Sequence, residues 1–202
     1  MSFVLTRSFY DRPTLDVARD LLGKVLVHER RGVRTSGVIV EVEAYIGEAD
    51  PACHAAPGPT PRNAPMYGAP GHAYVYLNYG IHWMANIVTE SRGSPAAVLL
   101  RALDPLEGLE VMRRRRGPVR RQRDFCRGPG NLTKAMGITL TENRADLLGT
   151  RLYVEDRGLQ VASIAWGPRI GINAGTEHPW RAWVQTHPAV SRGAPAAGSR
   201  RR

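Results

Sequence analysis

Two acidic residues, Glu41 and Glu43, lie inside the otherwise apolar stretch VIVEVEAYI at residues 38–46. Successive side chains of an extended chain alternate between faces, so both acids should share one face with Ile39 while the valines form the other. An ionised carboxylate that is buried without a partner is costly, so these acids require solvent, a cation or a chemical role. The pattern alone favours an edge strand with the acids facing water and pairing with arginines. Catalysis by one of the carboxylates is the alternative.

Further polar and aromatic groups follow the two acids along the chain. Residues 47–71 form a Gly-, Pro- and Ala-rich stretch that carries Asp50 and His54, and irregular segments of this length are often functional. In the stretch AYVYLNYG at residues 73–80, alternation places Tyr74 and Tyr76 on one face. Tyr79 should lie at the tip of a β-hairpin, where no core is present for it to fill.

The charge of the chain indicates an anionic partner. It has 28 Lys and Arg against 18 Asp and Glu, which gives a net charge of +10 and a pI near 10.4. This excess favours nucleic acid or an anionic membrane surface. The arginine-rich span 113–127 is either a solvated basic loop or a patch that contacts phosphates.

The elements that must position these groups alternate between short strands and short helices. We expect a helix from Thr14 that ends at Gly23, and a second helix whose N-terminus is capped at Asp104-Pro105. That second helix should direct Leu106 and Met112 inward. The other expected elements are a short helix at residues 131–136 and strands at residues 24–30, 38–46, 73–77, 81–88, 96–103, 151–154, 161–166, 169–173 and 181–185. This order predicts an α+β fold: a mostly antiparallel, curved sheet with short flanking helices and a protruding hairpin.

The chain of 202 residues with 43% apolar composition fits one domain, expected at residues 1–188. Residues 189–202 read as a disordered basic tail. No apolar run is long enough for a membrane span and no signal-type segment is present, so we expect a cytoplasmic protein. Two distant cysteines predict neither a disulfide framework nor a zinc site, and we expect no metal and no organic cofactor.

Several motifs together resemble the alkyladenine (3-methyladenine) DNA glycosylase family, from about Phe9 to about Val184. In chain order they are VEVEAY at 40–45, the span 50–54, TPRN at 60–63, YVY at 74–76, YG at 79–80, MAN at 84–86, LLRAL at 99–103 with PLEG at 105–108, GP at 128–129 and RIG at 169–171. Each motif is weak alone, whereas their order over nearly the whole chain is specific.

The resemblance implies a role for each matching residue. Glu43 would be the general base that activates water for attack on the sugar C1′, and Arg101 would hold that water. Tyr45, His54 and Tyr76 would enclose the extruded base, and Asn86 would exclude the amino group of normal guanine. Four further residues are expected to contact DNA: Tyr79 as the wedge in the duplex, with Met66, Tyr67 and Arg62 as surface residues beside it.

The resemblance therefore predicts a monomeric, monofunctional glycosylase that releases alkylated or deaminated purines from double-stranded DNA in base excision repair. Candidate lesions are 3-methyladenine, 7-methylguanine, hypoxanthine and ethenoadenine. No lysine lies near the motifs, which argues for water as the nucleophile. Two alternatives are a non-catalytic module that stacks bases on its tyrosines, and a hydrolase of another glycosidic bond that uses Glu41 and Glu43 as a pair.

Overall fold

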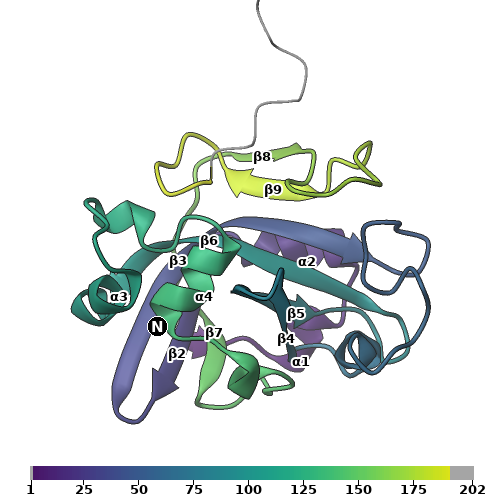
Figure 1. The fold of residues 1–202 in the computed structure, drawn as a ribbon, viewed down its shortest axis with the longest axis horizontal. Helices are drawn as coiled ribbons and strands as arrows, with labels where there is room; N and C mark the ends of the chain where they lie inside the picture. The colour runs from purple at the N-terminus through teal and green to yellow at the C-terminus, as the bar shows by residue number, and fades with distance from the viewer. Residues whose placement is uncertain (1, 192–202) are drawn as a thin grey trace, which may run out of the picture.

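The computed structural model describes residues 2–191 of the chain (Figure 1). Within them, nine strands form one sheet in the order β1-β7-β2-β3-β6-β5-β4, while β8 and β9 pair with each other and β9 also pairs with β3. The strands are β1 (Phe3–Val4), β2 (Val25–Arg30), β3 (Val33–Ile46), β4 (Ala73–Asn78), β5 (His82–Val88), β6 (Ala96–Glu107), β7 (Leu152–Asp156), β8 (Ile164–Gly167) and β9 (Arg181–Val184). The α-helices are α1 (Arg7–Tyr10), α2 (Thr14–Leu21), α3 (Leu109–Arg116) and α4 (Pro129–Met136). The predicted α+β class with an antiparallel sheet and short helices is confirmed.

Strand β3 lies inside the sheet, so the predicted edge strand is wrong. Its residues 36–46 pair with β6, its residues 33–38 pair with β2, and Glu41–Glu43 pair with Arg181–Trp183 of β9. Both acids are fully buried. They therefore depend on protein partners rather than on water.

The predicted alternation along β3 is broken near Val40. Ile39 pairs with Leu103 and Glu41 with Ala102, so Val40 is left as an extra residue in the register. Such a bulge reorients the residues on one side of it. Ile39, Val40 and Val42 consequently belong to the same apolar core, together with residues of β6, α2 and α4. The expectation that Ile39 shares a face with Glu43 is wrong.

Strand β6 continues through the segment in which a helix was expected to begin. Gly37 pairs with Pro105 and Ser36 with Glu107, and α3 starts only after Gly108, whose φ is +73°. Pairing with β3 therefore overrides the local capping signature, and Leu106 is exposed rather than inward. Met112 is buried as predicted.

Two expectations for the C-terminal part are also wrong. Residues 169–173 lie in a loop and not in a strand. Ala189 is fully buried in the main core and Ser191 bonds to Glu41, so the expected tail does not begin at 189. The rest of that tail, residues 192–202, lies outside the described residues.

The hairpin β4–β5 is confirmed. Its turn is closed by the Ile81 N–H, which donates to the Asn78 carbonyl at 3.1 Å, and both central residues have positive φ, +49° at Tyr79 and +70° at Gly80. This is a type I′ turn, whose twist matches that of paired strands. The Tyr79 side chain is 85% exposed at the tip. Across residues 2–191, no helix has the length and apolar character that a bilayer span requires.

Candidate active site

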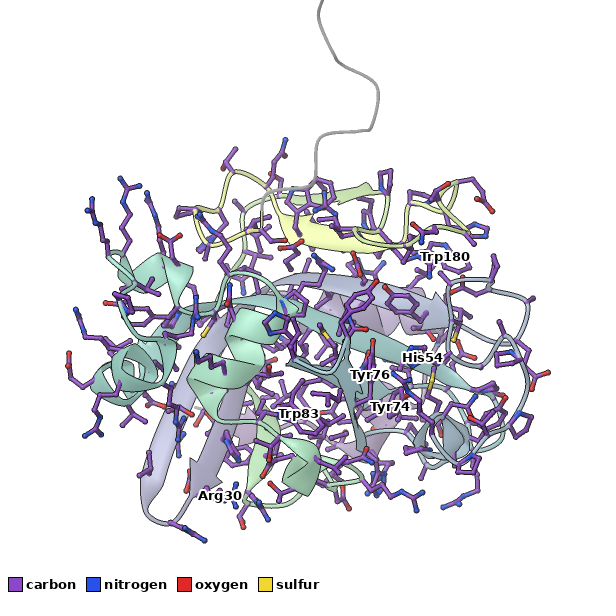
Figure 2. All side chains as sticks on the ribbon, in the orientation of Figure 1. Arg30, His54, Tyr74, Tyr76, Trp83 and Trp180 are labelled. Carbon is purple, nitrogen blue, oxygen red and sulfur yellow. The ribbon has the colours of Figure 1, made fainter. Side chains whose placement is uncertain are left out.

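A cavity of about 390 Å³ lies between β3, the hairpin β4–β5 and two loops, at residues 47–71 and 168–173. Its size falls within the range of small-molecule sites, roughly 300–1,000 Å³. The structure brings seven of the expected site residues to its lining: Tyr45, His54, Met66, Tyr76, Tyr79, Asn86 and Arg101. The labelled rings of His54, Tyr74 and Tyr76 lie together in Figure 2.

Glu43 is fully buried directly behind this lining. Its Oε1 accepts the Ile170 N–H at 2.7 Å and lies 3.1 Å from Arg101 Nη1. Its Oε2 accepts the Tyr45 hydroxyl at 2.9 Å. A carboxylate has about four lone-pair sites, so Oε2 retains capacity for another donor, such as water. Burial and the charge of Glu43 raise the pKa of Tyr45, so that its hydroxyl remains a donor.

Glu41 is bonded differently from Glu43, although it lies on the same strand. It accepts Arg101 Nε at 3.0 Å and Arg181 Nη1 at 3.2 Å. The Ser191 N–H and hydroxyl donate to it at 2.6 and 2.7 Å. The expected pairing of Glu41 with arginine is confirmed, and Arg101 bridges the two acids.

An ion pair between Asp50 and Arg169 fixes the two loops that flank the cavity. Arg169 donates to the two carboxylate oxygens of Asp50 at 2.6 and 2.8 Å, and both side chains are fully buried. It also donates to the Ala44 carbonyl at 3.0 Å, and its guanidinium lies 4.7 Å from the ring centre of Tyr45. Burial opposes ionisation of Asp50, but the bonds from Arg169 and Ala52 hold its pKa below the usual value.

Sequence reasoning missed the role of Arg169 because its partner lies 119 residues away. The available signal was that Asp50 and Arg169 both belong to motifs of the family resemblance, the span 50–54 and RIG at 169–171. The geometry now shows why Ile170 can reach Glu43: its neighbour Arg169 anchors the loop.

His54 contacts the aromatic wall of the cavity. Its ring centre is 4.4 Å from that of Tyr76, and its Nδ1 is 2.8 Å from the Tyr74 hydroxyl. Burial, and then the nearby Arg62, lower the pKa of His54, so the imidazole is neutral at pH 7. Burial raises the pKa of Tyr74 to about 12.

Asn86 is oriented by the backbone of the neighbouring strand. Its Nδ2 donates to the Tyr74 carbonyl at 3.0 Å, and only 5% of the residue is exposed. The amide is therefore fixed at the cavity wall rather than free to rotate.

The residues expected on the DNA-facing surface fall into two groups. Tyr79 is exposed as expected, and Ile81 beside it, which sequence reasoning missed, is 72% exposed. Met66 is only 2% exposed and lines the cavity, so the expectation of a surface position for Met66 is wrong: the 3₁₀ turn Ala64–Tyr67 directs it inward. Tyr67 is partly buried and donates to Glu48 at 2.8 Å. Arg62 donates to the Leu77 carbonyl at 3.2 Å, beside the ring of Tyr76.

The donors needed for a metal site are not gathered anywhere in the described part of the chain. No group of three or more His, Cys, Asp or Glu side chains converges within residues 2–191. Both cysteines are free and buried.

The chain is similar to a protein family and to several curated proteins. A family model described as methylpurine-DNA glycosylase matches residues 8–188. Three similar curated proteins have names that contain the words 3-methyladenine DNA glycosylase. The protein of Methanocella arvoryzae is 52% identical over 95% of this chain and 98% of its own. That of Burkholderia lata is 51% identical over 88% and 86%, and that of Chlorobaculum parvum 48% identical over 93% and 90%.

Proposed function

The chain belongs to the methylpurine-DNA glycosylase family, and we propose that it hydrolyses the N-glycosidic bond of a damaged purine extruded from duplex DNA. It is a DNA glycosylase, a hydrolase of DNA repair that acts on alkylated purines. Beyond this activity, we propose which nucleophile it uses, which residues act and which lesions it removes.

One observation supports the mechanism above all others: Glu43 is buried behind an aromatic cavity, and its Oε2 accepts one hydrogen bond, from Tyr45, among the described residues. In the proposed reaction this oxygen accepts a proton from water as the water attacks the sugar C1′. The bond from C1′ to the purine nitrogen breaks, and its electron pair leaves with the base. The negative carboxylate also stabilises the oxocarbenium-like transition state.

The aromatic wall favours an electron-poor base. Tyr45, Tyr76 and His54 offer ring faces, and a cationic alkylated purine is attracted to such faces. His54 is neutral at pH 7, so it does not repel that cation. We assign Asn86 to the exclusion of the guanine amino group, and Arg101 to the attacking water.

Water is the proposed nucleophile because the alternative requires an amine. A glycosylase that forms a Schiff base needs a nucleophilic amine in its site. The chain has two lysines, Lys24 and Lys134, and neither lines the cavity. The proposed enzyme is thus monofunctional and leaves an abasic site.

The proposed substrate is double-stranded DNA, bound by a monomer in the cytoplasm, with Tyr79 inserted at the position of the extruded nucleotide. We propose that the glycosylase domain includes residues 189–191, which is supported by the burial of Ala189 and the bond of Ser191 to Glu41. Proposed lesions are 3-methyladenine, 7-methylguanine, hypoxanthine and ethenoadenine.

The test is a panel of duplexes, each with one of these lesions, analysed for strand breaks before and after alkali. We expect breaks only after alkali, free base as the product, and no covalent enzyme–DNA complex after borohydride treatment. Breaks without alkali, or a trapped complex, would contradict the monofunctional mechanism. Tight binding without any alkali-labile site would instead support a non-catalytic stacking module.

A further inference from the structure

A second hollow, of about 340 Å³, lies beside the first, between the hairpin tip and the helices α3 and α4. Ile81 and His82 form its wall on the hairpin side, whereas Tyr79 lines the first cavity. The helix α4 contributes to both, with Pro129 in the cavity and Gly130 in the second hollow. The two hollows therefore adjoin at the tip of the hairpin.

Two cations line this second hollow, Arg115 and Lys134. Neither forms a salt bridge with an acid among residues 2–191. Arg115 is fixed by its bond to the Ala135 carbonyl at 3.0 Å, and it lies over Gly137, where an added Cβ would come within 2.7 Å of its Cζ. Burial, Arg114 and Arg30 lower the pKa of Arg115, so the surroundings favour the arrival of an anion.

We propose that this hollow binds the phosphodiester backbone of the damaged duplex, on the side of the hairpin tip away from the cavity. Arg115 and Lys134 are the phosphate ligands. Duplex DNA is a dense line of negative charge, and a fixed guanidinium with free donors suits a phosphate oxygen. The proposal rests on the proposed insertion of Tyr79, which sets the duplex across both hollows.

The test measures the dissociation constant for a lesion duplex against salt concentration. Each phosphate contact contributes about 0.9 to the slope of log K against log salt. We expect Lys134→Gln and Arg115→Gln to weaken binding and each to lower the slope by about that amount. Arg19→Gln is the matched control, because it removes one charge from α2, which lines neither hollow.

Equal salt slopes for Lys134→Gln, Arg115→Gln and Arg19→Gln would overturn the proposal that the second hollow binds the DNA backbone. If the wild-type protein itself fails to bind the duplex, the proposed function fails as well. Shortening the duplex on one side of the lesion gives a further check. The weaker binding of Lys134→Gln relative to the wild-type protein should disappear when the duplex arm that crosses the second hollow is removed. If the difference in binding persists whichever arm is removed, the second hollow does not bind the DNA backbone.

A separate observation concerns how Arg101 is shared between Glu41 and Glu43. Its Nε bonds to Glu41 at 3.0 Å, and only Nη1 contacts Glu43, at 3.1 Å. Glu41 is itself held by Arg181 and by both donors of Ser191. The buried cluster of two acids and two arginines is electrically balanced.

We propose that Glu41 is a positioning residue that divides the Arg101 guanidinium between two carboxylates, which leaves Oε2 of Glu43 without an arginine donor and able to accept a proton from water. Without Glu41, Arg101 would be free to form a two-bond pair with Glu43, the geometry that guanidinium and carboxylate prefer. The groups that face Glu43 are Tyr45 on its own strand, Arg101 on β6, Arg181 on β9, Arg169 on the adjoining loop and Tyr76 on the hairpin. This inference rests on the proposed role of Glu43.

The test is the single-turnover rate of base release against pH in two variants. Glu41→Gln should lower the rate roughly tenfold, a fraction of what general-base catalysis supplies, and move the acidic limb to lower pH. Arg181→Gln should move the acidic limb to higher pH, because Glu41 then draws Arg101 away from Glu43. A merely structural role would lower the folded fraction without moving either limb.

Unmoved limbs, or limbs that move in the same direction, would overturn this inference. If Glu41→Gln does not fold, the direction of the shift in Arg181→Gln decides the question. A Glu43→Gln variant with wild-type release would instead remove Glu43 from its proposed role as the base. Loss of release in Glu43→Gln together with unmoved limbs would remove only the role of Glu41.

Discussion

Asp50 and Arg169 connect the two loops of the site through a fully buried ion pair. The same arginine lies against the ring of Tyr45 and precedes the Ile170 N–H that bonds to Glu43. The position of the proposed base therefore depends on a pair that lies outside the cavity lining.

Replacing Asp50 with Asn should destabilise the protein strongly. Removing one partner of a buried pair leaves the other charge uncompensated and costs about 3–5 kcal/mol. The measurement is urea unfolding at pH 7, with Asp16→Asn as the control, since Asp16 and Arg19 form a half-exposed pair worth at most about 1 kcal/mol. Equal losses in the two variants would contradict the assignment.

The same pair predicts a pH dependence. The folded-state pKa of Asp50 lies below the unfolded value of about 3.9, so the unfolded chain binds the proton first. The stabilisation is complete above that unfolded value and is lost as the pH falls toward the folded one. Between pH 5 and pH 3 the wild-type protein should therefore lose more unfolding free energy than Asp50→Asn. Parallel curves would show that Asp50 does not contribute.

The base and the tip of the hairpin β4–β5 have different surroundings. Its base places Tyr74 and Tyr76 against His54, while its tip exposes Tyr79 and Ile81. The positive φ of Tyr79 is uncommon for residues other than Gly, Asn and Asp. The tip therefore holds Tyr79 in a strained backbone conformation that leaves its ring exposed.

Tyr79→Asn should separate stability from base release. Asn tolerates the same backbone conformation and the ring is exposed, so the unfolding free energy should change by less than about 0.5 kcal/mol. Release from a fully paired lesion duplex should fall, and release from a mismatched one should fall less, because opening that duplex costs less. Phe3→Ser, which removes an exposed ring from β1, is the control. An equal loss on paired and mismatched duplexes would contradict the wedge.

At the scale of the whole molecule, the C-terminal segment 189–191 packs against the centre of the sheet and contacts Glu41. Ala189 is buried in the core, and Ser191 bonds to Glu41 at the middle of the sheet. The last described residues are therefore part of the support of the site.

Ending the chain after Pro188 should lower the unfolding free energy by about 2 kcal/mol or more, since hydrogen bonds to a charged group contribute about 1.5–3 kcal/mol each. The measurement is urea unfolding, with a chain that ends after Ser191 as the control because it keeps both donors to Glu41. Equal midpoints for the two truncated chains would contradict this role of the segment.

Local pattern predicted the parts of this molecule that depend on local geometry. The alternation of Tyr74 and Tyr76, the exposed Tyr79 and the arginine partner of Glu41 all follow from spacing and charge. What failed depends on distant partners. The bulge at Val40 and the extension of β6 through Pro105 are set by pairing between β3 and β6, and the bond of Ser191 to Glu41 spans 150 residues. No local signal encodes such contacts.

The resemblance to a known family named candidate site residues that lie far apart in the chain. Its motifs include Glu43, Tyr45, His54 and Tyr76; the last three line one cavity, and Glu43 lies behind that lining and bonds to Tyr45. It included Arg169 in a motif without giving it a role, and it led to a surface position for Met66, which is buried. The catalytic roles themselves stay predictions.

The most direct test of the central claim is base release by Glu43→Gln under single-turnover conditions, with excess enzyme and a lesion-containing duplex. The amide keeps the shape of the side chain but is a far weaker base, so we expect duplex binding to remain and release to fall by about 10²-fold or more. Binding should be measured on the same duplex in the same buffer. A variant that binds normally and releases the base at the wild-type rate would show that Glu43 is not the base.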